Sequence, residues 1–137
     1  MLPLRPAVFT RVLLSLAPLR KEVLLLIHLD RKGAYLGDEV IAGGTAWSFG
    51  MPYRWMFEQA FRRGASGLVL AHNHPSGTAR PSAHDIRSTR GLQALAVPME
   101  IELIDHLIVG RDALFSMRAA GLLDDRPCRS QRADALT

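Results

Sequence analysis

The sequence predicts a mixed α/β fold in which helices pack against a β-sheet. Two patterns carry this prediction. Apolar runs such as "EVLLLIHLD" at 22–30 and "SGLVLAHNH" at 66–74 have the length of strands and are too short for most helices. Other segments carry apolar residues at helical spacing, as amphipathic helices do. Over 137 residues, the alternation of the two patterns favours one domain that is large enough to bury a core.

Four elements are expected in the first half of the chain. Residues 6–19 place apolar side chains on one helical side and predict a helix. The run at 22–30 predicts a buried strand, and the turn "RKG" leads from it into a second strand at 34–43, forming an antiparallel hairpin. The segment that follows contains Gly43, Gly44 and Gly50, which favour an irregular backbone. Pro52 suits the first turn of a helix over 52–64.

The second half begins with a strand at 66–74, followed by "PSGTARP", whose composition is that of a loop. Ser82 then starts a helix that runs to about residue 96. The remaining elements are shorter or less regular, and we expect strands at 99–110 and 113–117 and a final helical turn at 118–123. The chain therefore divides into an N-terminal helix within 1–19, a domain over 20–123 and a disordered tail at 124–137.

Composition limits the possible functions. The single cysteine, Cys128, excludes a disulfide framework and a thiolate zinc site, and it indicates a reducing, cytoplasmic environment. The formal net charge of +4 permits contact with nucleic acid or acidic partners without specifying either. No apolar run approaches the roughly 18–20 residues of a membrane span. Membrane partners are therefore not expected, and the oligomeric state stays open.

Residues 72–85 hold the strongest chemical signal. His72 and His74 are two apart on a predicted strand, so both side chains lie on the same face and can converge on one ion. The loop that follows can return Asp85 to the strand end, which completes three zinc ligands and leaves a fourth position for water. A structural interpretation is equally open. Ser82 and Asp85 fit a helix-capping box, and the histidines can simply reach solvent.

A hydrolytic zinc site also needs a group that accepts a proton from water. Glu22 is one candidate, because it opens the most apolar strand, where a carboxylate is costly without a role. The simpler interpretation, a strand-end residue in solvent beside Lys21, is favoured by the residues alone. The other candidates are Glu39, Glu100 and Glu102.

The stretch "HNHPSGTARPSAHD" resembles the metal-binding signature of the JAB/MPN (JAMM) metalloprotease family, in which His-x-His-Pro is followed by Ser and, three positions later, Asp. Together with "LIDHLIVG", it is most similar to the RadC-like branch, over about residues 20–123. The resemblance implies a single cytidine-deaminase-like domain with a curved mixed sheet flanked by helices. It also implies hydrolysis of peptide or isopeptide bonds, one Zn²⁺ per chain and a peptide or protein substrate.

The resemblance also implies a role for each site residue. His72, His74 and Asp85 match the zinc ligands. Ser82 matches the serine that stabilises the tetrahedral oxyanion, and Glu22 matches the glutamate that acts as general acid and base on zinc-bound water.

Other functions compete with this one. A non-enzymatic nucleic-acid or protein-binding module fits the DNA-repair label that RadC-like proteins carry. It would use exposed arginines to contact phosphates, namely Arg54, Arg62, Arg63, Arg80, Arg87 and Arg90. A metal-bearing domain without catalysis is a third possibility.

Several further residues receive structural interpretations. Structural roles are favoured for His28 and for the pair Asp105 and His106, and a surface position for His84. Core packing is favoured for at least half of the aromatic residues Trp47, Phe49, Tyr53 and Trp55, although they could line a substrate groove.

Overall fold

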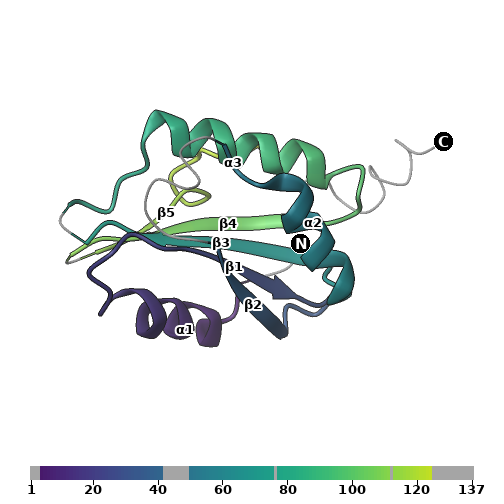
Figure 1. Ribbon diagram of the computed structural model, residues 1–137, viewed down its shortest axis with the longest axis horizontal. Helices are drawn as coiled ribbons and strands as arrows, with labels where there is room; N and C mark the ends of the chain where they lie inside the picture. The colour runs from purple at the N-terminus through teal and green to yellow at the C-terminus, as the bar shows by residue number, and fades with distance from the viewer. Residues whose placement is uncertain (1–3, 42–49, 76, 112, 125–137) are drawn as a thin grey trace.

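A computed structural model describes residues 4–41, 50–75, 77–111 and 113–124 and shows a five-stranded mixed sheet with helices on both faces (Figure 1). This arrangement confirms the α/β prediction. The elements in chain order are α1 (Pro6–Leu16), β1 (Leu24–Leu29), β2 (Tyr35–Ile41), α2 (Tyr53–Arg62), β3 (Gly67–Asn73), α3 (Ala83–Ala96), β4 (Glu102–Val109) and β5 (Leu114–Ser116).

The strands lie in the order β2-β1-β3-β4-β5. The predicted hairpin is confirmed, because β1 pairs antiparallel with β2. On its other side β1 pairs antiparallel with β3, whereas β3 and β4 are parallel and α3 makes the crossover between them. Every residue of β3 is buried. The last residues of this central strand lie close to the first turn of α3, where Asp85 Oδ2 is 3.6 Å from His72 Nε2.

The register of β3 and β4 contains a shift of one residue. Leu68 pairs with Leu103, but the next residue, Val69, pairs with Asp105, so that Leu70 lies opposite His106. A β-bulge of this kind moves the residues that follow it to the opposite face of the sheet. His106 consequently shares the face of Leu70.

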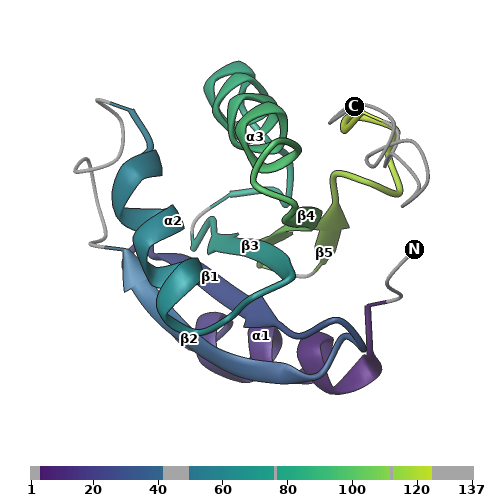
Figure 2. The ribbon, with the colours of Figure 1, turned by 90° about the vertical axis from the view of Figure 1, so that its right-hand side faces the viewer.

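Two apolar cores lie on the two faces of the sheet, and Figure 2 shows α1 on one side and α2 and α3 on the other. The alternation of β3 divides its side chains between them. Leu68 and Leu70 pack with Met56 of α2 and Leu92 of α3. Val69 and Ala71 pack on the α1 side, with the buried stripe of that helix, Val8, Val12 and Leu16. His72 continues the face of Leu68 and Leu70.

Several predicted elements have other bounds than those observed; β4, for example, begins at Glu102 rather than at residue 99. Helix α1 ends at Leu16 rather than residue 19, because Pro18 has no backbone N–H with which to continue the helical hydrogen bonds. Strand β1 starts at Leu24 and not at Glu22. Residues 118–123 form a turn and not a helix, because Gly121 adopts a φ of 73° and Arg118 bonds carbonyls of β4. Asp124, the first residue of the predicted tail, forms hydrogen bonds with Gln93. The rest of the tail (125–137, with Cys128) and the aromatic residues Trp47 and Phe49 fall outside the described residues.

Tyr53 and Trp55 both pack against the core beside α2. The hydroxyl of Tyr53 donates to the Ser88 carbonyl at 2.7 Å. The core interpretation of these two aromatic residues is therefore confirmed. Among the described helices, none has the length and apolar character that a membrane span requires.

Candidate metal centre

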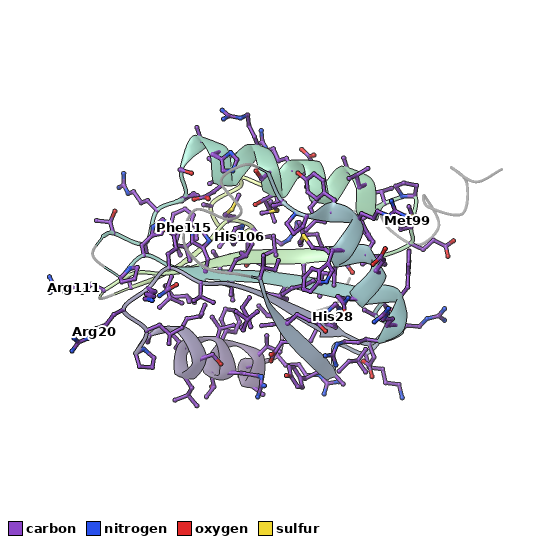
Figure 3. All side chains as sticks on the ribbon, in the orientation of Figure 1. Arg20, His28, Met99, His106, Arg111 and Phe115 are labelled. Atoms are coloured by element: carbon purple, nitrogen blue, oxygen red, sulfur yellow. The ribbon has the colours of Figure 1, made fainter. Side chains whose placement is uncertain are left out.

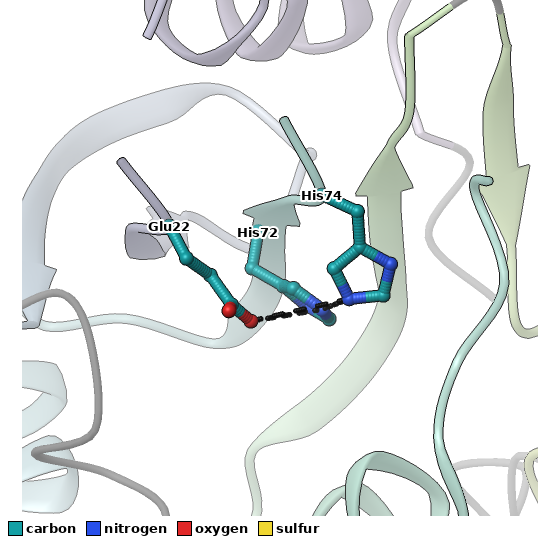
Figure 4. Close-up of side chains that lie close together, drawn as sticks. All are labelled: Glu22, His72 and His74. Atoms are coloured by element: carbon teal, nitrogen blue, oxygen red, sulfur yellow. Dashed lines mark hydrogen bonds and ion pairs between the residues drawn. The ribbon is translucent and has the colours of Figure 1, made fainter. Parts of the chain in front are cut away.

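His72 and His74 converge at the end of β3, as the strand periodicity predicts. Their Nε2 atoms are 2.8 Å apart (Figure 4). His74 lies one residue beyond the strand, where its backbone N–H donates to the Val109 carbonyl at 2.8 Å. Its Nδ1 donates to the Thr78 carbonyl at 3.1 Å. In a neutral imidazole this arrangement leaves Nε2 of His74 without a proton and directs its lone pair towards His72.

Glu22 completes a group of three. Its Oε1 lies 4.0 Å from His72 Nε2 and 3.9 Å from His74 Nε2. One ligand atom from each of Glu22, His72 and His74 lies within 4.8 Å of the others, close enough to hold one metal ion. The pairing of Leu24 with His72 explains the position of Glu22, because the chain just before β1 passes beside the end of β3.

Asn73 fixes this segment from the opposite face of β3. Its Oδ1 accepts from the Val23 N–H at 2.7 Å, and its Nδ2 donates to the Lys21 carbonyl at 2.8 Å. The side chain of Asn73 thus gives the backbone on both sides of Glu22 the hydrogen bonds that a neighbouring strand would otherwise provide. Sequence reasoning assigned no role to Asn73, because the partners are about fifty residues away.

Ser82 and Asp85 form the predicted capping box at the start of α3. The Ser82 hydroxyl accepts from the Asp85 N–H at 3.0 Å, and Asp85 Oδ2 accepts from the Ser82 N–H at 2.8 Å. The same Oδ2 lies 3.6 Å from His72 Nε2. Capping and proximity to the histidines therefore coexist, although Asp85 lies beside the Glu22–His72–His74 group and is not part of it.

The chemistry of these atoms fits a divalent cation. Four acceptor-type atoms come together: one oxygen each from Glu22 and Asp85 and one imidazole nitrogen each from His72 and His74. Two carboxylates close to two nitrogen lone pairs repel one another unless a cation or protons lie between them. Two nitrogens bound tetrahedrally to one zinc would be about 3.3 Å apart, only slightly farther than these two. Histidine and carboxylate ligands suit zinc but also accept other divalent ions.

The electrostatics of the site favour a neutral His72 and a more basic Glu22. Burial, reinforced by His74 and opposed by Asp85, lowers the pKa of His72 from 6.5 to about 4. Burial also raises the pKa of Glu22 above 4.5, and Asp85 reinforces this rise while His74 opposes it. The His72 side chain is fully buried, whereas those of His74 and Glu22 are 23% and 38% exposed. The site is therefore open to solvent on the side of His74 and Glu22.

His106 and Thr89 lie directly behind His72. His106 Nε2 is 2.6 Å from His72 Nδ1, and His106 Nδ1 is 2.7 Å from the Thr89 hydroxyl. Burial lowers the pKa of His106 well below 6.5. Figure 3 shows His106 between the sheet and α3. His106 is therefore a buried structural residue, as expected, and it also contacts His72, a candidate metal ligand. The only sequence signal for this contact is the segment "LIDHLIVG".

The remaining candidate bases lie elsewhere. Glu39 bonds His28 Nε2 and accepts from Arg63 Nε at 2.5 Å. It therefore belongs to a structural cluster around His28, which pairs with Leu68 and not with the histidine end of β3. His28 is buried, as expected, and its Nδ1 has no hydrogen-bond partner among the described residues. Glu102 begins β4, at the end opposite to the paired His72 and Ile108, and Glu100 precedes it.

The other predicted surface residues have mixed outcomes. His84 is half-buried rather than exposed, and its Nε2 lies 3.5 Å from the Ser88 hydroxyl. Three of the six arginines have intramolecular partners: Arg54 pairs with Glu58, Arg63 with Glu39, and Arg90 donates to the Leu122 carbonyl. These contacts do not test phosphate binding, so the interpretation of the arginines as a phosphate-binding surface stays a prediction.

The chain is similar to known proteins over most of its length. Residues 5–122 match the family model of the RadC-like JAB domain. A UPF0758 protein of Clostridium perfringens is 40% identical over 113 residues, which cover 82% of this chain and 49% of the relative. A UPF0758 protein of Trichodesmium erythraeum is 39% identical over 110 residues, covering 80% and 45%. One from Pseudoalteromonas translucida is 33% identical over 117 residues, covering 85% and 52%. The chain spans about half the length of these curated relatives.

Proposed function

The chain belongs to the RadC-like JAB domain family, and from that premise we propose that it is a zinc-dependent hydrolase of peptide or isopeptide bonds. The observation that carries the proposal is the meeting of two imidazole nitrogens, 2.8 Å apart, with carboxylate oxygens of Glu22 and Asp85 no more than 4.0 Å from His72 Nε2. The substrate is a peptide or protein in the cytoplasm, consistent with a single cysteine.

In this proposal His72, His74 and Asp85 hold the ion. A zinc ion held by these residues would supply a water molecule of lowered pKa and a Lewis acid for the carbonyl group of the substrate. Glu22 accepts the proton from the water and passes it to the leaving amine. Its raised pKa supports this role, because a carboxylate whose pKa is closer to neutrality is a stronger base.

Ser82 stabilises the developing oxyanion. Its oxygen accepts from the Asp85 N–H at 3.0 Å, a bond that leaves the hydroxyl hydrogen free to donate. A hydroxyl held in place by a helix cap loses little freedom when it donates to new negative charge. The capping box therefore orients the group that the reaction requires.

The first test is the zinc content of the full chain, purified without added metal and analysed by elemental analysis. We expect about one zinc per chain in the wild-type protein, and its loss in His74→Ala and in Asp85→Asn. The asparagine keeps an oxygen that can accept from the Ser82 N–H, so the helix cap survives while the ligand charge is removed. His84→Ala is the matched control and retains the metal.

Glu22→Gln separates a base from a ligand. If Glu22 is the base, the variant keeps its zinc and loses hydrolysis of a panel of quenched peptides and lysine isopeptides. Loss of zinc would instead place Glu22 among the ligands. If the folded wild-type protein cannot be loaded with zinc and binds DNA with a steep salt dependence, the hydrolase proposal is excluded. The nucleic-acid-binding module is then favoured.

A further inference from the structure

A buried chain of hydrogen bonds links the backbone of α3 to His72. The Thr89 hydroxyl lies 2.6 Å from the Asp85 carbonyl and 2.7 Å from His106 Nδ1. His106 Nε2 in turn lies 2.6 Å from His72 Nδ1. Thr89, His72 and His106 are each fully buried. The chain therefore ends on the imidazole nitrogen of His72 that faces away from the metal centre.

The chemistry of the donors fixes the direction of each bond. A carbonyl oxygen can only accept, so the Thr89 hydroxyl hydrogen must point to Asp85. The Thr89 oxygen then accepts, and His106 Nδ1 carries the proton. A cationic His106 would leave a positive charge without a counter-charge in a fully buried position, which is costly. His106 Nε2 is therefore bare, and His72 Nδ1 must donate to it.

We infer that Thr89 and His106 are positioning residues that hold His72 in its Nδ1–H tautomer, so that the lone pair of Nε2 faces the metal centre. The opposite tautomer would place a proton on Nε2, between His72 and His74, where a metal ion would have to displace it. The inference rests on the proposed function only in so far as it predicts metal affinity, since the tautomer exists in the metal-free protein as well.

Thr89→Val tests this chain of hydrogen bonds, the relay from the Asp85 carbonyl through Thr89 and His106 to His72, with almost no change in side-chain shape. Without the hydroxyl, His106 loses the acceptor that keeps its proton on Nδ1, and both His106 and His72 can adopt the opposite tautomer. Thr89→Ser is the matched control, because it keeps the hydroxyl and removes only a methyl group. Circular dichroism establishes that both variants are folded before any comparison is made.

The primary measurement is the tautomer of His72, read from long-range ¹H–¹⁵N correlation spectra of the metal-free full chain at pH 7.5. We expect the Nδ1–H form in the wild type and in Thr89→Ser, and a mixture or the Nε2–H form in Thr89→Val. An Nε2–H tautomer in the wild type would overturn the inference without any variant. An unchanged tautomer in folded Thr89→Val would equally exclude Thr89 as the residue that sets it.

The second measurement is the zinc Kd, obtained by competition with a chromophoric chelator. Loss of a partner behind a ligand typically weakens metal binding by roughly 10–100-fold, and we expect that loss in Thr89→Val but not in Thr89→Ser. If the tautomer changes and the affinity does not, the relay does not serve the metal. If neither the wild type nor either variant binds zinc while the tautomers behave as expected, the proposed function is wrong. The inference about the tautomer of His72 then still holds.

Discussion

The side chain of Asn73 binds the backbone on both sides of Glu22. It accepts from the Val23 N–H at 2.7 Å and donates to the Lys21 carbonyl at 2.8 Å. Asn73 is flanked by the two histidines and points to the opposite face of the strand, so one short peptide positions three groups of the candidate site. His72 and His74 reach the centre directly, and Asn73 brings Glu22 to it.

Asn73→Leu should uncouple Glu22 from the histidines. The variant leaves the Val23 N–H and the Lys21 carbonyl without their partner, and loss of such buried bonds costs about 1–3 kcal/mol of unfolding free energy, measurable by urea denaturation. Hydrolysis should fall by roughly 100-fold through displacement of Glu22, while zinc affinity stays within about threefold. A parallel loss of zinc would show that Asn73 supports the ligands instead.

Ser82→Ala should separate the two functions of the helix cap. Removing the hydroxyl costs about 1 kcal/mol of stability. Zinc affinity should remain, because Asp85 Oδ2 accepts from the backbone N–H of Ser82, which alanine keeps. Hydrolysis should fall by roughly 100-fold. In Ser82→Thr the hydroxyl remains, and stability and rate should both stay close to the wild-type values; a rate unaffected by Ser82→Ala removes Ser82 from the mechanism.

Gly110→Ala should disturb the loop that carries His74. A Cβ atom at Gly110 would lie 2.6 Å from the backbone nitrogen of Ala79 and 2.8 Å from its Cβ, so the loop must move away from the end of β4. We expect a lower melting temperature and weaker zinc binding, because Thr78 accepts from His74 in this loop. Gly77→Ala is the control, since its nearest contact would be His74 Cβ at 3.9 Å. Equal behaviour of the two variants would contradict the close approach.

The metal-free protein should lose stability on mild acidification. Burial lowers the pKa of His72 to about 4, and it also lowers those of His28 and His106. The unfolded chain therefore binds more protons below about pH 6.5, and stability falls as the pH falls from there towards 4. For His72 alone the loss is on the order of 3 kcal/mol.

Glu22 acts in the opposite direction, because a raised carboxyl pKa favours the folded state as it becomes protonated. It is one partly exposed group against three buried histidines, so the net effect remains a loss. Urea denaturation at pH 7 and pH 5, with chelator present, measures it. A midpoint that rises at pH 5 would contradict the buried, neutral histidines.

The parts of the site that follow local rules could be predicted from the sequence. The two-residue period of a strand places His72 and His74 together, and Ser-x-x-Asp predicts the capping box before any contact is known. Both patterns lie within a few consecutive residues and depend on no distant partner.

The relay behind His72 could not be predicted in this way. Its geometry depends on the bulge that pairs Val69 with Asp105 and hence places Leu70 opposite His106. Without that single shift, His106 would point towards α1 and could not reach Thr89. Register between strands is set by packing of the whole sheet, and a hydrophobic pattern read along β4 does not reveal a one-residue shift.

The double use of Ser82 and Asp85 affects how related sequences should be interpreted. A related protein without catalytic activity would still gain helix stability from the capping box, and selection for folding alone would preserve both residues. Glu22 lies outside any strand or helix and faces the two histidines. In a survey of such proteins, the presence of a glutamate at this position should therefore distinguish active from inactive members better than the serine and aspartate do.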